Sequence, residues 1–269
     1  MGRLPVNKYI MNRIVVYTAI FNNYDWLKDP VVVSDGVDYI CYTDSDKVKS
    51  QTWKIIRVDL DGLSPSLLNR KIKLLYPYTE LKDYDYSLYV DGSVMIKDDV
   101  GHFLHQYIND DLVMMNFRHP HNDCIYEEIK RCLRRGSGDP IKLKEQYKIY
   151  KKDAMPEHAG LSDNKVILRY HHSEIGKILM ESWYSQVVDY SGRDQTCLSY
   201  VLYKHHQSYS FFKENIEKNR YFETWPHNTV VWYIRYWRHF KWFCERHHLF
   251  GGLIAYFDDH IKPWILKRI

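Results

Sequence analysis

The alternation of short β-rich runs with helical segments in the first third of the chain constrains the fold more than any other feature. Four runs rich in Val, Ile and Tyr, each ending in polar turn-forming residues, predict strands over residues 13–21, 38–43, 53–59 and 86–92. Between the last two, residues 65–81 carry apolar side chains at helical spacing. This order predicts an α/β fold with a mainly parallel central sheet and helices on its faces.

The rest of the chain adds helices and one further strand. A charged stretch, residues 122–154, predicts two solvent-exposed helices interrupted at Gly136–Pro140. A strand over 165–172, a helix over 174–188 and a second helix beginning near 193 complete the pattern.

The length and a change of composition predict two parts. A chain of 269 residues is long enough for one main domain plus an appendage. Because the composition changes after about Trp225, we expect a main domain over 1–228 and a tail over 229–269.

On a helical wheel of residues 232–246 the tail is amphipathic. One face holds Tyr233, Tyr236, Trp237, Phe240, Phe243 and Cys244, and the other holds Arg235, Arg238, His239 and Arg246. Such a helix can lie on an anionic membrane surface. It can equally pack on the main domain or on a second copy in a homodimer, and both interpretations stay open.

Composition narrows the classes of partner. The net charge of +4 favours anionic partners, but no recognition motif accompanies it, so we expect no nucleic acid. The 24 Tyr and 8 Trp suit carbohydrate faces and membrane interfaces as well as ordinary packing. Five scattered cysteines without zinc-like spacing favour a reduced cytoplasmic protein with buried thiols. No run of 18 apolar residues and no signal-like N-terminal region are present.

The stretch YDYSLYVDGSV, residues 84–94, places Asp91 at the end of a predicted strand. Ligands of parallel sheets bind beyond the carboxyl ends of the strands. A carboxylate in a tight turn can hold a divalent cation, while Gly92 lets a phosphate approach closely. Nucleotide-sugar enzymes use an Asp-x-Asp motif in this way, but the third position here is Ser93, and a plain β-turn is the alternative.

Several stretches over about 12–228 resemble one family in the order in which they occur. They are IVVYTAIFNNYDWL, VDYICYTD, TWKI, NRKIKLLYPY, YDYSLYVDGSVMI, HPHNDCIYEEI, GL with VILRYHH, and RDQTCLSYVLYK. The family is the glycosyltransferase-like family of plant turgor-regulation and mucilage-synthesis proteins and bacterial polysaccharide-cluster proteins. It is similar to GT-A glycosyltransferases of the galactosyltransferase type, which implies a Rossmann-like fold, a nucleotide-sugar donor and manganese or magnesium.

The resemblance implies roles at the donor side. Asp91 and His227 would hold the metal, and Gly92 and Ser93 would lie against the donor. The nucleotide base would rest on Thr18, Ala19, Ile20 and Phe21, with Asp44 on base or ribose. Arg70 and Lys73, three apart on one helix face, would reach phosphate or a sugar hydroxyl; a solvated helix face is the alternative. A rival histidine, His260 in HIKPW, loosely resembles an element of family-eight transferases.

It also implies roles at the reacting sugar. Arg193 and Asp194 belong to an Arg-Asp-Gln block in which the acid faces donor sugar or acceptor, although Asp194 could instead cap a helix. Asp163 stands where Glu is expected and Asn122 where Arg is expected, which leaves the acceptor contacts open. His119 would line the site, or be a buried hydrogen-bonded histidine.

These residues predict a metal-dependent glycosyltransferase that moves a hexose or related sugar from a UDP-type donor to a hydroxyl of a glycan or lipid-linked acceptor in surface-polysaccharide synthesis. Asp194 or Asp163 would deprotonate the acceptor if the enzyme inverts, or shield the oxocarbenium-like centre if it retains. We expect it in the cytoplasm, peripheral to the inner face of the membrane. The alternatives are a catalytically decayed nucleotide- or glycan-binding module and a haloacid-dehalogenase-type phosphatase.

Overall fold

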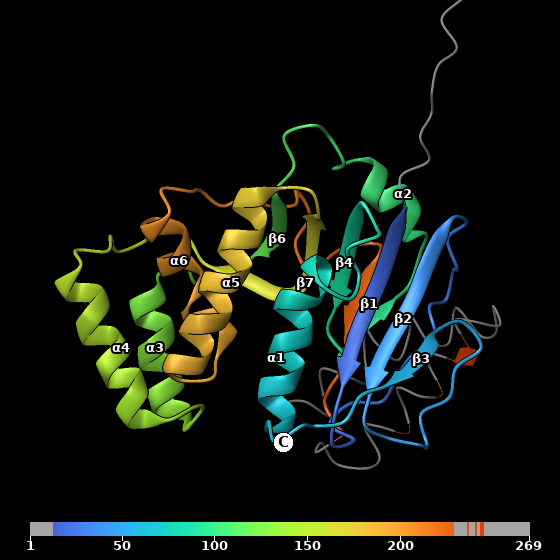
Figure 1. The fold of residues 1–269 in the computed structure, drawn as a ribbon, viewed down its shortest axis with the longest axis horizontal. Coiled ribbons are helices and arrows are strands. Elements are labelled where there is room, and N and C mark those ends of the chain that lie inside the picture. Colours follow the sequence, from blue (N-terminus) through green and yellow to red (C-terminus); the bar gives the residue numbers. More distant parts are fainter. Residues whose placement is uncertain (1–12, 229–235, 237–239, 241–242, 245–269) are drawn as a thin grey trace, which may run out of the picture.

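The computed structural model describes residues 13–228 together with Tyr236, Phe240, Phe243 and Cys244. Within them, a six-stranded sheet has the order β3-β2-β1-β4-β7-β6 (Figure 1). Its strands are β1 (Ile14–Ile20), β2 (Val37–Thr43), β3 (Lys54–Arg57), β4 (Tyr86–Val90), β6 (Met114–Arg118) and β7 (Ser162–Tyr170).

The direction of the strands confirms the predicted α/β fold with a mainly parallel sheet. Strands β3, β2, β1 and β4 are mutually parallel, whereas β7 is antiparallel to both β4 and β6. Strand β6 therefore points the same way as β4. The carboxyl ends of these five strands and the amino end of β7 lie along one side of the sheet, which we call the carboxyl edge.

Helices cover the sheet and extend beyond it (Figure 1). They are α1 (Pro65–Leu75), α2 (Val100–His105), α3 (Ile125–Arg135), α4 (Pro140–Lys152), α5 (Glu174–Asp189) and α6 (Leu198–Lys204), with 3-10 turns η1 (Tyr76–Tyr78) and η2 (Asp194–Thr196). Strand β1 contributes Val16 to one core cluster and Val15 to the other. Because this strand is buried on both faces, it reads as a continuous apolar run.

Helix α1 carries several of the predicted site residues. It begins where Ser64 accepts a hydrogen bond from the Leu67 backbone N–H and Pro65 occupies the first turn. The predicted helix over 65–81 is shorter in the structure, because Pro77 lacks the N–H that a continuing helix needs. The chain tightens there into η1.

Helices α3 and α4 are separated at the predicted place, where Gly136 takes the left-handed conformation and Asp139 caps α4. The prediction that both are solvent-exposed was wrong for one face of each. Ile129 of α3 and Leu143 of α4 are fully buried and belong to a third core cluster. Most of their charged residues cover the outer faces, but Glu128 of α3 is fully buried and pairs with Arg131.

A second, two-stranded sheet was not predicted. Strand β5 (Val94–Ile96) pairs antiparallel with β8 (Phe222–Thr224). Just beyond it, the Trp225 backbone N–H donates to the Ser93 carbonyl at 2.6 Å. This ribbon brings the segment before residue 228 next to the turn that follows β4.

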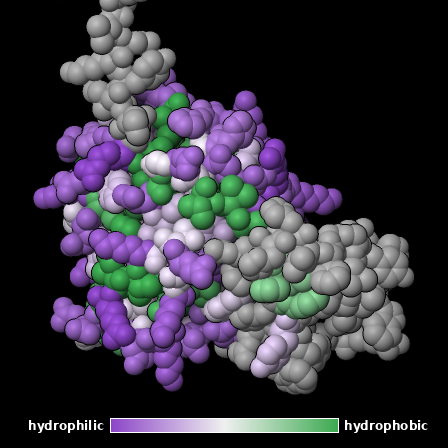
Figure 2. Space-filling view, turned by 90° about the vertical axis from the view of Figure 1, so that its right-hand side faces the viewer, coloured by the Kyte–Doolittle hydropathy of each residue, from purple (hydrophilic) through white to green (hydrophobic). Residues whose placement is uncertain are grey.

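The five cysteines are buried and free, as predicted. None of the helices in the described part of the chain has the length and apolar character to cross a bilayer. The expectations for the tail, including His260, lie outside the described residues except at four positions, where Tyr236, Phe240 and Phe243 are exposed and Cys244 is buried. On the face shown in Figure 2, hydrophobic side chains gather in small patches among hydrophilic ones.

Candidate functional site

The carboxyl edge brings together predicted site residues that are far apart in the sequence. Asp91 follows β4, Phe21 follows β1 and Asp44 follows β2. His119 follows β6, and Asp163 is the second residue of the reversed strand β7. All five therefore lie along the edge at which ligands of such sheets bind.

Asp91 sits in a tight turn closed by a hydrogen bond from the Val94 N–H to the Asp91 carbonyl at 2.8 Å. Its Oδ1 accepts from the Gly92 N–H at 3.1 Å and from the Tyr89 hydroxyl at 3.3 Å. Among the described residues, no donor reaches Oδ2. The carboxylate is thus held through one oxygen while the other is available to a ligand.

Gly92 is required by close contact rather than by backbone conformation. A Cβ at this position would lie 2.8 Å from Ile20 Cγ1 and 3.0 Å from Asp25 Cβ. The Gly92 carbonyl accepts from Lys28 Nζ at 2.6 Å. Ser93, only 3% exposed, is buried behind the turn. The loop after β1 therefore presses directly on the Asp91 turn and fixes its position.

His227 reaches the same turn from the other end of the described chain. Its Nδ1 lies 2.8 Å from Asp25 Oδ1, and its ring lies 4.4 Å from that of Tyr24. The hydrogen bond with Asp25 raises the pKa of His227; burial opposes this, and the carboxylates of Asp25 and Asp91 add to it. Asp25 was not predicted, because nothing in the spacing of its neighbours marks it.

A metal centre made by the protein alone is absent from the part of the chain that the structure describes: no three His, Cys, Asp or Glu side chains come together. The predicted ligands Asp91 and His227 nevertheless lie at the same turn, because Asp25, whose carboxylate bonds His227 Nδ1, lies against Gly92, the residue after Asp91. The structure therefore offers two ligands at most, and metal binding stays a prediction.

The second half of the site is a largely buried cluster of two cations and one acid, in which the Arg70 side chain is 21% exposed. Lys73 Nζ donates to Asp194 Oδ2 at 2.5 Å, and Arg70 Nε lies 3.3 Å from Oδ1. Arg70 Nε is buried and has no hydrogen bond of good geometry, despite that short distance. The side chains of Lys73 and Asp194 are 2% and 10% exposed, so neither is part of a solvated surface.

The charges of this cluster shape one another. Burial alone would raise the pKa of Asp194, but Arg70 and Lys73 hold it well below its usual range. Burial lowers the pKa of Lys73, although Asp194 counteracts it. Burial would also lower the pKa of Arg70, but Asp194 and then Asp91 raise it above its usual value. The side chains of Arg70, Lys73, Asp194 and Asp91 therefore influence one another's pKa values as one group.

Two alternatives left open by the sequence are excluded. Lys73 does not lie on a solvated helix face. Asp194 does not cap a helix: η2 and α6 begin without a side-chain cap, and the Asp194 carboxylate pairs with the cations instead.

The end of β1, where the nucleotide base is expected to bind, is buried and hydrogen-bonded to α1. Thr18, Ala19, Ile20 and Phe21 are all 2% or 3% exposed at the end of β1. Asn69 Nδ2 donates to the Ala19 carbonyl at 2.6 Å and so ties α1 to β1. Both carboxylate oxygens of Asp44 accept from the Asn22 backbone N–H at 3.1 Å.

The remaining predicted residues lie toward β6 and β7. Asp163, 6% exposed, pairs with Lys165 at 2.7 Å. His119 accepts at Nδ1 from the His121 N–H, and burial lowers its pKa against the raising effect of nearby carboxylates. Arg193 turns toward the loop between α3 and α4, where its Cδ would contact a Cβ at Gly138.

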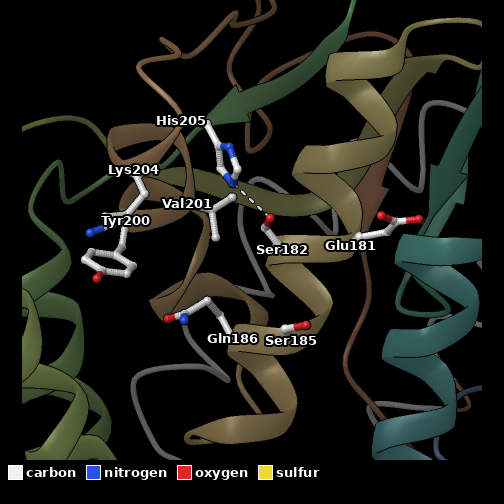
Figure 3. A pocket seen from close by; sticks show the side chains of 8 residues that line it. All are labelled: Glu181, Ser182, Ser185, Gln186, Tyr200, Val201, Lys204 and His205. Atoms are coloured by element: carbon white, nitrogen blue, oxygen red, sulfur yellow. Dashed lines mark hydrogen bonds between the residues drawn. The ribbon is translucent and has the colours of Figure 1, made fainter.

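A cavity of about 400 Å³ between α5 and α6 contains none of the predicted site residues. Figure 3 shows its lining, with a hydrogen bond of 2.8 Å between Ser182 Oγ and His205 Nε2. A second cavity of about 450 Å³ lies at the end of β6. The residues around Asp91 and Asp194 therefore do not line the cavity between α5 and α6.

Residues 6–227 match the family described as TOD1/MUCI70, glycosyltransferase-like domain. The chain belongs to this family. No curated protein sequence matches it.

Two solved structures are similar to the fold. The bifunctional glycosyltransferase WbbM is 12% identical with a TM-score of 0.49, and the match covers 76% of this chain and 40% of WbbM. Mouse xyloside xylosyltransferase 1 is 11% identical with a TM-score of 0.43, over 74% of this chain and 84% of that one. The chain thus spans less than half of the length of WbbM.

Proposed function

We propose that the protein is a glycosyltransferase of the GT-A type that moves a hexose or related sugar from a UDP-type donor to a hydroxyl of a glycan or lipid-linked acceptor. Membership of the TOD1/MUCI70 family supports the reaction class. The observation that carries the proposal is the cluster of Arg70, Lys73 and Asp194 next to the Asp91 turn at the carboxyl edge. This cluster of charged side chains would bind an anionic ligand.

The charge balance of this region supports a diphosphate. Arg70, Lys73 and Arg193 are three cations that act on Asp194, and the carboxylates of Asp194 and Asp91 supply two negative charges. The Nε atoms of Arg70 and Arg193 are buried and have no hydrogen-bond partner among the described residues. Buried cations need a counter-charge. The diphosphate would also offer Arg70 Nε the acceptor that it lacks.

The proposal includes a divalent metal, manganese or magnesium, held by Asp91 and His227. Such ions are commonly bound by one or two protein ligands together with substrate phosphates, so two protein ligands are sufficient. The Oδ2 of Asp91, to which no described residue donates, fits this role. The Asp25 carboxylate holds His227 through Nδ1, which leaves Nε2 for a metal. When bound, the metal would neutralise charge on the diphosphate.

The two candidate acids suit different tasks. A carboxylate with a strongly lowered pKa is a poor proton acceptor, so Asp194 would orient Lys73 and Arg70 toward the leaving diphosphate. Asp163, at the β7 side of the edge, would accept the proton of the acceptor hydroxyl. In a retaining reaction the same acid would shield the developing positive charge on the sugar.

A combined binding and turnover experiment tests the donor class. We expect UDP to raise the melting temperature, more strongly with manganese than without, and UDP-sugar hydrolysis to be lost in Asp91→Asn. Ser182→Ala, in the cavity between α5 and α6, is the control and should behave as wild type. If no nucleoside diphosphate stabilises the protein, the proposal is wrong. Stabilisation without hydrolysis or transfer would instead support a binding module.

We also propose that the tail, residues 229–269, brings the enzyme to the inner face of an anionic membrane that carries its acceptor. Its basic and aromatic sequence supports this. Flotation with anionic vesicles should be lost on deletion of the tail. Unchanged flotation rejects the membrane role, and a concentration-dependent change of mass would favour packing in a homodimer.

A further inference from the structure

The cavity at the end of β6 has a composition that the proposed donor site does not explain. Its lining includes Arg118 and Phe211, beside Asp123, His158, Gly160 and Tyr209; we call it the Arg118 pocket. Arg118 is the last residue of β6, and Gly160 lies two residues before β7. The Arg118 pocket is therefore on the carboxyl edge, at the β6 end of the sheet.

The guanidinium of Arg118 is oriented but not neutralised. Its Cζ lies 4.3 Å from the ring centre of Phe211, a cation–π contact. Phe211 stacks on Tyr209 with ring centres 4.8 Å apart and planes 15° apart. Among the described residues, no carboxylate lies within ion-pair distance of Arg118. Stacking restricts the side chain while its N–H groups stay available for a planar anion.

The aromatic pair is fastened to the loop that leads into β7. Gly160 has φ +97°, and a Cβ there would lie 3.1 Å from Tyr209 Cδ2, so only glycine allows this approach. Ser199 Oγ lies 2.8 Å from the Tyr209 hydroxyl and donates to the Gly160 carbonyl at 2.9 Å. Three residues of chain then lead to Asp163, a span of about 10 Å if extended.

The lining of the Arg118 pocket also contains a polar pair, Asp123 and His158. Asp123 Oδ1 lies 2.6 Å from His158 Nδ1, and both side chains are exposed. The hydrogen bond with Asp123 raises the pKa of His158. While His158 is protonated it balances Asp123, so that Arg118 gives the lining a net positive charge. The lining also offers hydrogen-bonding groups for hydroxyls.

We propose that the Arg118 pocket binds the acceptor glycan through a carboxylate or phosphate group that the glycan carries. The inference rests on the proposed glycosyltransferase function and names its acceptor class. Arg118 would pair with the anionic group, and the exposed parts of the aromatic pair would contact a sugar face. The hydroxyl to be glycosylated would lie toward Asp163.

Binding to the full-length protein tests this directly. The probes are trigalacturonate, galactose 1-phosphate, neutral galactotriose and inorganic phosphate. Their binding is measured by saturation-transfer NMR and by thermal shift. We expect at least one of the two anionic sugars to bind more tightly than galactotriose and inorganic phosphate, and Arg118→Gln to weaken it at least about tenfold. Phe211→Leu, which removes the stacking partner, should weaken it less. Trigalacturonate points to a uronate, and galactose 1-phosphate to a phosphate.

Arg135→Gln removes an exposed arginine at the end of α3 and should change nothing. Equal binding of galactotriose or inorganic phosphate, unchanged binding by Arg118→Gln, or no binding of either anionic sugar at millimolar concentration overturns the proposal. UDP stabilisation is measured in parallel and should be the same in Arg118→Gln. If UDP fails in every protein, the donor proposal fails, whatever the pocket binds.

Discussion

The Arg70–Asp194 cluster and the Arg118 pocket both present arginine at the carboxyl edge, but they are built differently. Arg70 lies on α1 among buried partners and faces Asp194 and Asp91. Arg118 is exposed, is oriented by one aromatic ring and has neighbours from three loops. The first is part of the folded core, while the second lies on its surface.

The difference indicates what each region can recognise. Buried cations held by strands and helices keep one geometry, which suits an invariant group such as a diphosphate. A stacked arginine among loops can accept different sugars as long as they carry an anionic group. Substitutions should therefore change stability and activity together in the first region, and acceptor binding alone in the second.

The largest effect is expected for Asp194→Asn. It leaves Lys73, 2% exposed, without its counter-charge, and breaking a buried pair in this way costs about 3–5 kcal/mol of the free energy of unfolding. Donor hydrolysis should be lost as well. Urea unfolding measures the first and a coupled UDP assay the second. Adding Lys73→Met should recover part of the stability but no activity; a double variant less stable than Asp194→Asn would contradict this account.

Gly92→Ala should have the next largest effect. The added methyl would meet Ile20 Cγ1 at 2.8 Å and Asp25 at 3.0 Å, so the loop after β1 must shift. Overpacking of this kind costs about 1–3 kcal/mol. Urea unfolding measures the loss. Unchanged stability of Gly92→Ala would contradict the close packing of this loop on the Asp91 turn.

A smaller effect is expected for the pH dependence of donor hydrolysis, which follows the protonation of His227. Because its pKa is raised above 6.5 in the folded protein, the pairing with Asp25 stabilises fully below pH 6.5 and is lost as pH rises through the folded value. A metal needs the neutral imidazole. Manganese-stimulated donor hydrolysis should therefore increase above pH 6.5, with a midpoint that Asp25→Asn moves down. If the midpoint does not move in Asp25→Asn, Asp25 does not set the pKa of His227.

The smallest effect on stability is expected for Arg118→Gln. An exposed side chain without an ion-pair partner among the described residues contributes within about 0.5 kcal/mol. Unfolding and UDP binding should match wild type, and the KM for an anionic acceptor should rise. A loss of stability similar to that of Asp194→Asn would remove the distinction between the two regions.

The sequence predicted the fold where local pattern and burial agree. Strand β1 is buried on both faces and rich in β-branched residues, so its pattern is strong. Strand β6 was missed because Met114–Arg118 contains no Val or Ile, and β5 and β8 because three residues are too few to show a period. Their pairing is decided by tertiary contacts.

The candidate site was predictable from local pattern where a residue ends a strand, and Asp91 was found in this way. Arg70, Lys73, Asp194 and His227 were found through the family resemblance. Asp25 and Lys28 were not found, because their defining hydrogen bonds span 202 and 64 positions. Such separations leave no trace in a short window of sequence.

The reversed direction of β7 has a consequence for how the acceptor side can vary. Since β7 meets the carboxyl edge with its first residues, the connection from α4 to Ser162 arrives at the proposed acceptor side before the strand begins. That connection can lengthen or change composition without altering any strand of the sheet. The same scaffold could thereby serve different acceptors while the donor half stays as it is.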